Sequence, residues 1–357
     1  MTIEQLDRAK TEEFAGRMLE VLNGGTMALM IGVGHQTGLF DTLAGLPPST
    51  SEKIAQAAGL NERYVREWLG GLVLGRVIEY DPPHQTYWLP PEHAASLTRA
   101  AGPDNLAFFA QYLALLGVVE PMVVNSFHHG GGVPYSAYPR FQELQAEETA
   151  RVYDATLIDV TVPLVPGAVE RLRQGAEVLD IGCGSGHAIN LLAAEFPRSR
   201  FAGYDFSEEG IAAARAEATK LGLTNARFEV RDIATLSESA RYDLITAFDT
   251  VHDQAKPQSV LRNVADALKP DGVFLMVDIA ASSRLEENME HPLGPTLFAF
   301  SVFHCMTVSL AQGGEGLGTV WGEQKAREML AEAGFGSVEV KQVEGDILNS
   351  YYIARKA

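Results

Sequence analysis

The segment VLDIGCGSG, residues 178–186, places three alternating glycines directly after an apolar run. Glycine adopts positive φ and lets the backbone approach a ligand closely, so the pattern predicts a buried strand, a ligand-binding turn and then a helix. A dinucleotide fingerprint would need its third glycine where this chain has His187, and a phosphate-binding loop would need Gly-Lys-Ser/Thr. The turn matches neither of these two motifs.

Short β-rich segments alternate with amphipathic helical segments from Gly175 onward. This alternation predicts an α/β domain with a seven-stranded, doubly wound Rossmann-like sheet covered by helices on both faces. The expected strands are residues 176–182, 200–205, 226–232, 242–248, 272–279, 338–343 and 350–356.

The 357 residues are too many for one ordinary core, so we expect two domains. Residues 1–125 are predicted to form a mainly helical domain, and residues 175–357 the sheet domain with an insertion at 281–322. Residues 126–174 are predicted to be a helical linker that contributes to the cover of the active site.

The N-terminal part resembles a winged helix. Residues 51–60 and 62–75 are predicted helices, and residues 76–90 contain two strands joined by a Pro-Pro turn. Residues 49–100 hold five Lys/Arg against six Asp/Glu, and the whole chain has a net charge of −18. Because helices that read DNA normally present a positive face, we expect a structural or dimerising role and no nucleic-acid partner.

Aspartates end three successive predicted strands, namely Asp180, Asp205 and Asp232. In open α/β sheets, ligands bind at the carboxyl ends of the strands. A carboxylate can accept two hydrogen bonds from a vicinal diol. The three acids and the glycine turn therefore predict one ligand site.

On these residues, the region from Gly175 to Lys356 resembles the class I S-adenosylmethionine-dependent methyltransferases, whose first motif is hydrophobic-hydrophobic-D-x-G-x-G-x-G. The resemblance implies S-adenosylmethionine as cofactor and S-adenosylhomocysteine as product. It places Asp205 on the ribose and Asp232 on the adenine amino group. The implied cofactor residues are Asp180, Gly182, Cys183, Gly184, Gly186, Asp205, Phe206, Asp232, Ile233, Phe248 and Asp249.

His252 and Asp253 follow the fourth strand and are the candidate catalytic residues. They resemble the His-Asp pair of small-molecule O-methyltransferases with a winged-helix dimerisation domain, in which the histidine deprotonates the acceptor hydroxyl. Imidazole suits that role because its pKa lies near neutral. Gln254 stands where that family usually has an aromatic residue, and a purely structural role for His252 stays open.

The insertion at 281–322 is too long for an ordinary connection. Long insertions often build a substrate pocket or its lid. We expect a pocket for a small apolar or aromatic acceptor, methylated on oxygen in preference to nitrogen. Its candidate residues here are Phe298, Phe303 and His304, with a plain core role as the alternative.

The layout of the whole chain resembles a bacterial group of winged-helix methyltransferases with a mycobacterial representative. The similar segments are residues 34–45, 128–141 and 303–322. This resemblance implies a homodimer formed through the N-terminal domain, and it places His35 and Tyr135 at the acceptor. A cofactor-binding regulator without turnover is the alternative function.

Other patterns exclude further classes of protein. Two cysteines predict no disulfide framework, in keeping with a cytoplasmic protein. We expect no metal, because His304-Cys305 has no other ligand at suitable spacing. Polar residues interrupt the apolar segment 106–124, so we expect a buried helix and no membrane span. Residues 81–84, DPPH, lack the aromatic residue of a nucleic-acid methyltransferase motif.

Overall fold

Two compact units make up the chain. The computed structural model describes residues 6–356, and the chain divides into Met1–Gly117 and Val118–Ala357. The division lies within the apolar helix α6 (Leu106–His129).

The first unit is mainly helical. Its elements before α6 are α1 (Arg8–Thr37), α2 (Leu39–Ala44), α3 (Ser51–Ala58), α4 (Glu62–Leu74), β1 (Glu79–Asp81), β2 (Thr86–Trp88), α5 (Pro91–Leu97) and the 3-10 segment η2 (Arg99–Asp104).

The helices α3 and α4 and the antiparallel pair β1–β2 form the predicted winged helix. Asn61 caps α4, because its side chain accepts a hydrogen bond from the Arg63 amide at 3.0 Å. Trp68, Leu69 and Leu72 place one face of α4 in the core of the unit. The winged-helix prediction is confirmed.

The second unit contains the predicted seven-stranded sheet. The strands lie in the order β5-β4-β3-β6-β7-β9-β8, and β9 alone runs antiparallel to the other six. Their bounds are β3 (Glu177–Ile181), β4 (Arg200–Asp205), β5 (Ala226–Val230), β6 (Tyr242–Phe248), β7 (Leu268–Ile279), β8 (Phe335–Lys341) and β9 (Asn349–Lys356).

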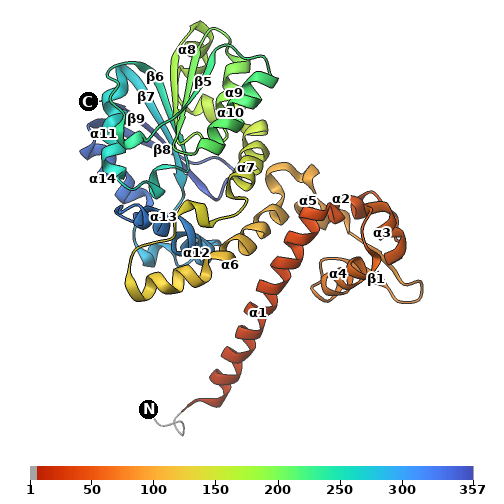
Figure 1. The fold of residues 1–357 in the computed structure, drawn as a ribbon. Coiled ribbons are helices and arrows are strands. Elements are labelled where there is room, and N and C mark those ends of the chain that lie inside the picture. The colour runs from red at the N-terminus through yellow and green to blue at the C-terminus, as the bar shows by residue number, and fades with distance from the viewer. Residues whose placement is uncertain (1–5, 357) are drawn as a thin grey trace. The chain divides into compact units, whose positions relative to one another are not determined.

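Helices cover both faces of this sheet, as predicted. Figure 1 shows α9 and α10 on one side and α11 and α14 on the other. Their apolar faces belong to two separate buried clusters, so the sheet has a core on each face. The helices are α8 (Ala168–Gln174), α9 (His187–Glu195), α10 (Glu208–Lys220), α11 (Pro257–Ala267) and α14 (Gly322–Glu332).

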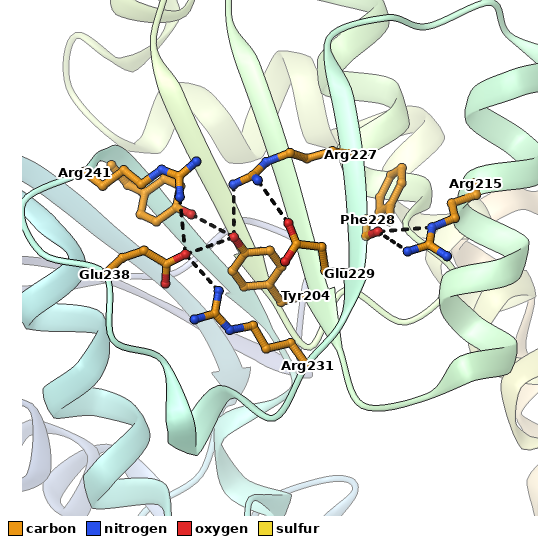
Figure 2. Close-up of polar contacts among 9 residues, drawn as sticks. Tyr204, Arg215, Arg227, Phe228, Glu229, Arg231, Glu238 and Arg241 are labelled. Atoms are coloured by element: carbon orange, nitrogen blue, oxygen red, sulfur yellow. Dashed lines mark hydrogen bonds and ion pairs between the residues drawn. The ribbon is translucent and has the colours of Figure 1, made fainter.

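A polar network joins β4, β5 and β6 near the end of β4 (Figure 2). The hydroxyl of the fully buried Tyr204 donates to Glu238 Oε1 at 3.1 Å and accepts from Arg227 Nη2 at 3.0 Å. Arg231 and Arg241 donate to the same Glu238 oxygen, at 2.8 and 3.3 Å. This network fixes the strand that ends at Asp205.

Residues 126–174 pack within the second unit. They contain η3 (Tyr135–Ala137), α7 (Phe141–Thr156), the π-helical turn η4 (Leu157–Thr161), η5 (Val162–Leu164) and α8. Tyr153 and Leu157 belong to one of the two sheet cores. The segment predicted to be a linker thus adds helices to the sheet domain.

The insertion forms a broken helical segment. It comprises η8 (Leu285–Asn288), α12 (Gly294–Phe300), the π-helical turn η9 (Ser301–Cys305) and α13 (Met306–Ala311). By length and composition, Leu106–His129 and Gly294–Ala311 could each cross a membrane, but 50% and 44% of their most apolar windows are buried inside the protein.

Candidate functional site

The glycine turn after β3 has the predicted conformation. Gly182, Gly184 and Gly186 have φ angles of 66°, 50° and 71°, which glycine adopts without strain. A Cβ at Gly182 would lie 2.2 Å from Thr250 Cγ2, whereas a Cβ at Gly184 would meet nothing within 4 Å. The turn is therefore packed against Thr250 at one glycine and open at the next.

Two buried carboxylates lie beside the turn. Asp205, 8% exposed, accepts hydrogen bonds from the amides of Gly184 at 2.9 Å and Ser207 at 2.7 Å, which tie the turn to the end of β4. Asp180, 2% exposed, accepts from Thr246 Oγ1 at 2.7 Å. Burial raises the pKa of Asp180 to about 7, although the Thr246 hydrogen bond acts to lower it.

The next strands add further predicted residues at the same edge. Asp232 is exposed and accepts from the Ala234 amide at 2.8 Å, and the adjacent Ile233 is buried. Phe248, at the end of β6, packs on Tyr153 with ring centroids 4.7 Å apart. Asp249 has a φ of 50°, a conformation that residues with side chains seldom adopt.

One cavity of about 470 Å³ in the second unit collects most of the predicted site. Among the side chains that line it is a carboxylate near the carboxyl end of each of β3, β4, β5 and β6. The predicted residues that line it are Tyr135, Asp180, Gly182, Cys183, Gly184, Asp205, Phe206, Asp232, Ile233, Phe248, Asp249 and Asp253. Gly186 does not line the cavity; a Cβ there would lie 2.5 Å from Ala214 Cβ, so this glycine allows close packing of α10.

Helix α7, in the segment predicted to contribute to the active-site cover, supplies a wall of the cavity through residues that the sequence analysis did not name. Its lining residues are Phe141, Gln142, Gln145, Thr149 and Tyr153. The last four recur every three or four residues and so share one helix face. That spacing was visible in the sequence, but nothing in it indicated that the polar face of this helix would meet the glycine turn.

His252 lies outside the set of residues that line the cavity. Its side chain is buried, and Nδ1 lies 2.8 Å from Oδ1 of Asp278, which also accepts from Trp321 Nε1 at 2.9 Å. Burial acts to lower the pKa of His252, but the Asp278 carboxylate and the nearby Cys305 together hold it well above its ordinary value. Its assignment as the base stays a prediction.

Asp253, the other candidate catalytic residue, faces the cavity. Its carboxylate accepts a hydrogen bond from the Tyr135 hydroxyl, and both side chains are half-buried. Burial raises the pKa of Asp253 to about 6, while the charge of His252 and the Tyr135 hydrogen bond act to lower it. Tyr135 thus lines the cavity, and its contact with the acceptor stays a prediction.

The other four acceptor candidates do not line this cavity. His304 is buried and stacks on Phe141 with centroids 4.3 Å apart, one layer behind the cavity wall. Phe298 is 41% exposed on α12, and the Phe303 carbonyl accepts from the Tyr138 hydroxyl at 2.5 Å. His35, in the first unit, is buried beside Phe108 with centroids 6.1 Å apart.

No group of three His, Cys, Asp or Glu side chains within residues 6–356 is arranged to hold a metal ion. Cys183 and Cys305 are both free thiols.

Both parts of the chain match known protein families. Residues 25–99 match the Rv2258c-like winged HTH domain, and residues 172–334 match a methyltransferase domain. The chain thus combines a winged HTH domain with a methyltransferase domain. The recognition made on the glycine motif and the winged helix is confirmed.

Curated relatives match the methyltransferase part. The malonyl-[acyl-carrier protein] O-methyltransferase of Bacillus cereus is 29% identical over 160 residues, which are 44% of this chain and 53% of the relative. The trans-aconitate 2-methyltransferase of Variovorax paradoxus is 34% identical over 122 residues, 34% of this chain and 42% of the relative. The chain thus spans about half the length of these relatives.

Solved structures share the fold across almost the whole chain. The mitomycin 7-O-methyltransferase MmcR has a TM-score of 0.73 and 20% identity, with 98% of this chain and all of the other covered. Human N-acetylserotonin methyltransferase, solved with S-adenosylmethionine, has a TM-score of 0.68 and 17% identity, with full coverage of both chains. Both likenesses confirm the predicted fold class.

Proposed function

We propose that the chain transfers the methyl group of S-adenosylmethionine to a hydroxyl group of a small apolar or aromatic acceptor. The observation that carries this proposal is the cavity of about 470 Å³ in the second unit, where the glycine turn, the strand-end carboxylates and the aromatic residues of the 135–153 segment line one space. Open α/β sheets bind their ligands at this edge.

The residues present fit the cofactor. Asp205 retains unused lone pairs after its two amide hydrogen bonds and would accept from the ribose hydroxyls. Asp232 would accept from the adenine amino group, with Ile233 and Phe206 beside the ring. Asp180 and Asp249 would face the positively charged methionine end. The cofactor would supply a methyl group bound to a positively charged sulfur. The methyl group leaves without the bonding electrons, which stay on the sulfur of S-adenosylhomocysteine.

The protein positions the reacting groups and excludes water from them. Holding two reacting groups in line can lower a barrier by about 7–11 kcal/mol. The face of α7 that includes Gln145, Thr149 and Tyr153 closes one side of the cavity and keeps water from that side. The residues that line the cavity include the rings of Tyr135, Phe141 and Phe206, which favour an apolar, flat acceptor.

The winged helix motivates the second candidate, a cofactor-binding regulator. Its second helix, α4, carries Arg63 and Arg66, but these pair on the same helix with Glu67 and with Glu62, the latter at 3.4 Å. Such pairing leaves little free positive charge for phosphates. We therefore favour the enzyme and propose no nucleic-acid or membrane partner.

We also propose that the protein acts as a cytoplasmic homodimer formed through its first unit. Helix α1 exposes a row of large apolar side chains, while its buried residues are Gly32, Gly34 and His35. Two copies of such a helix would shield each other from water.

A methyl-transfer screen tests the proposed function. Radiolabelled S-adenosylmethionine is offered with panels of phenols, hydroxylated lipids and amines, and cofactor binding is measured in parallel by calorimetry. We expect turnover with phenols. Tight cofactor binding without turnover in every panel would favour the regulator instead.

A further inference from the structure

Tyr135 and Asp253 form a hydrogen-bonded pair on the cavity wall, although 118 residues separate them. Tyr135 begins η3, and Asp253 ends the 3-10 segment η7 (Val251–Asp253) that follows β6. The Tyr135 hydroxyl donates to Asp253 Oδ2. Each carboxylate oxygen has two lone pairs, so Asp253 can still accept a hydrogen bond from a bound molecule.

His252 is less well placed to contact that molecule. Its Nδ1 is held by Asp278, and its side chain is only 4% exposed and lines no part of the cavity. His252 therefore lies behind Asp253 and outside the cavity lining.

Aromatic rings surround the pair. The ring of Tyr135 lies 5.1 Å from that of Phe206 and 5.9 Å from that of Phe141, measured between centroids. His304 packs edge-on against Tyr135 at 5.4 Å. Burial and the nearby His252 charge lower the pKa of His304 to about 3, so its imidazole stays neutral behind this aromatic wall.

We propose that Asp253, oriented by Tyr135, binds the hydroxyl of a phenol-like acceptor and removes its proton, and that His252 is a positioning residue. This inference rests on the proposed methyl transfer. The flat ring of the acceptor packs among Tyr135, Phe141 and Phe206, and its hydroxyl joins the hydrogen bond between Tyr135 and Asp253.

The step balances without a further reactant. The acceptor O–H bond breaks, its proton passes to the Asp253 carboxylate, and the bonding electron pair stays on the acceptor oxygen. That oxygen takes the methyl group and becomes a neutral ether. The carboxylic acid formed at Asp253 returns its proton to water when the product leaves.

The charged groups around Asp253 decide the pH at which it is ionised. They are His252 on η7, Asp278 at the end of β7, Asp205 at the end of β4, and the cavity residues Asp249 and Lys256. With a pKa of about 6, Asp253 is ionised at neutral pH and loses its capacity as a base as the pH falls through that value.

The test compares Asp253→Asn, Tyr135→Phe and the wild type with 1-naphthol and a set of simple phenols as probes. Asparagine keeps the shape of the side chain and its acceptor for Tyr135, but it takes up no proton. We expect kcat to fall at least about a hundredfold with KM little changed. Calorimetry should show unchanged affinity for S-adenosylhomocysteine in both variants.

Tyr135→Phe should move the acidic limb of the kcat/KM profile to higher pH, by about one unit, because the lost hydrogen bond had lowered the pKa of Asp253. Carboxyl ¹³C resonances, assigned with Asp253→Asn, should report the same shift without turnover. Tyr138→Phe is the matched control: its hydroxyl donates to the Phe303 carbonyl, and its ring also packs on His304.

The outcomes separate this inference from the proposed function. A wild type that methylates none of the probes overturns the phenol acceptor and with it the inference. A wild type that is active, with Asp253→Asn retaining turnover within about threefold and Tyr135→Phe leaving the limb in place, overturns the inference alone. An equal shift in Tyr138→Phe would also contradict the assigned role of Tyr135.

Discussion

At the scale of the residue, Asp205 has a structural contact and a proposed cofactor contact in one side chain. Asp205→Asn keeps an oxygen that accepts from the Gly184 or Ser207 amide, but it removes the negative charge. We expect the Kd for S-adenosylmethionine to rise at least about tenfold with a small change in melting temperature. Calorimetric titration measures the Kd, and Asp266→Asn, an exposed residue of α11, is the control. An unchanged Kd would refute the ribose contact.

The raised pKa of Asp180 predicts that the affinity for S-adenosylmethionine depends on pH. Its pKa of about 7 arises mainly from burial, so a cationic cofactor that favours the ionised form must displace a proton in part of the molecules. We expect the affinity for S-adenosylmethionine to rise as the pH rises through 7, with net proton release that calorimetry detects as a dependence on the buffer. Asp180→Asn should abolish the release; if it persisted, another group would be its source.

The site residues that were predictable from the sequence stand next to a motif. Gly182, Gly184 and Asp205 lie in or at the end of predicted strands and turns, where local spacing determines their position. The contact between Tyr135 and Asp253 depends instead on how η3 packs on the sheet domain, which no local spacing encodes. The same holds for the contact of His304 with Phe141.

At the scale of secondary-structure elements, one acidic side chain joins four helices and strands. Asp243 in β6 accepts hydrogen bonds from Arg171 of α8 at 2.5 Å, from Lys269 of β7 at 2.7 Å and from the Glu177 amide of β3 at 2.7 Å. Its side chain is 8% exposed, so these contacts are shielded from water. They hold the amino ends of the strands, opposite the cavity.

Asp243→Asn should lower the free energy of unfolding by about 2 kcal/mol without changing cofactor affinity. Asp271→Asn is the control, because Asp271 also pairs with Arg171 but is 73% exposed.

Burial acts to raise the pKa of Asp243, but Lys269, the Glu177 amide and Arg171 lower it overall. Its stabilisation is therefore complete above about pH 4 and is lost as the pH falls through the lowered pKa. Urea unfolding at pH 7 and pH 3 should show the difference from wild type narrowing in acid; a constant difference would contradict this.

The periodicity of apolar residues predicted which helices and strands form better than it predicted where they begin and end. Helix α11 ends at Ala267, and β7 begins at Leu268, four residues before the expected strand 272–279. Leu268 pairs with Tyr242 of β6 and Val273 pairs with Leu244, so the polar residues 269–272 form an irregularity between these two pairs. Hydrophobic pattern alone does not reveal an irregular pairing of this kind.

At the scale of the whole molecule, α1 predicts a melting temperature that depends on protein concentration. Phe14, Leu19 and Leu22 are each more than half exposed on this helix. If a second copy covers them, dilution should lower the melting temperature by mass action. Leu22→Glu should abolish that dependence, whereas Leu221→Glu, a half-exposed leucine of the second unit, should preserve it. Light scattering of the same samples reports the mass, and a monomer at all concentrations would refute the dimer.

The left-handed backbone of Asp249 has a consequence for how such a chain evolves. Glycine at that position would relieve about 1 kcal/mol of strain and cost a similar amount through the freer unfolded chain. Folding alone therefore exerts almost no selection between the two residues. A lineage that no longer bound its cofactor would therefore be free to lose this carboxylate while it kept the sheet that presents it.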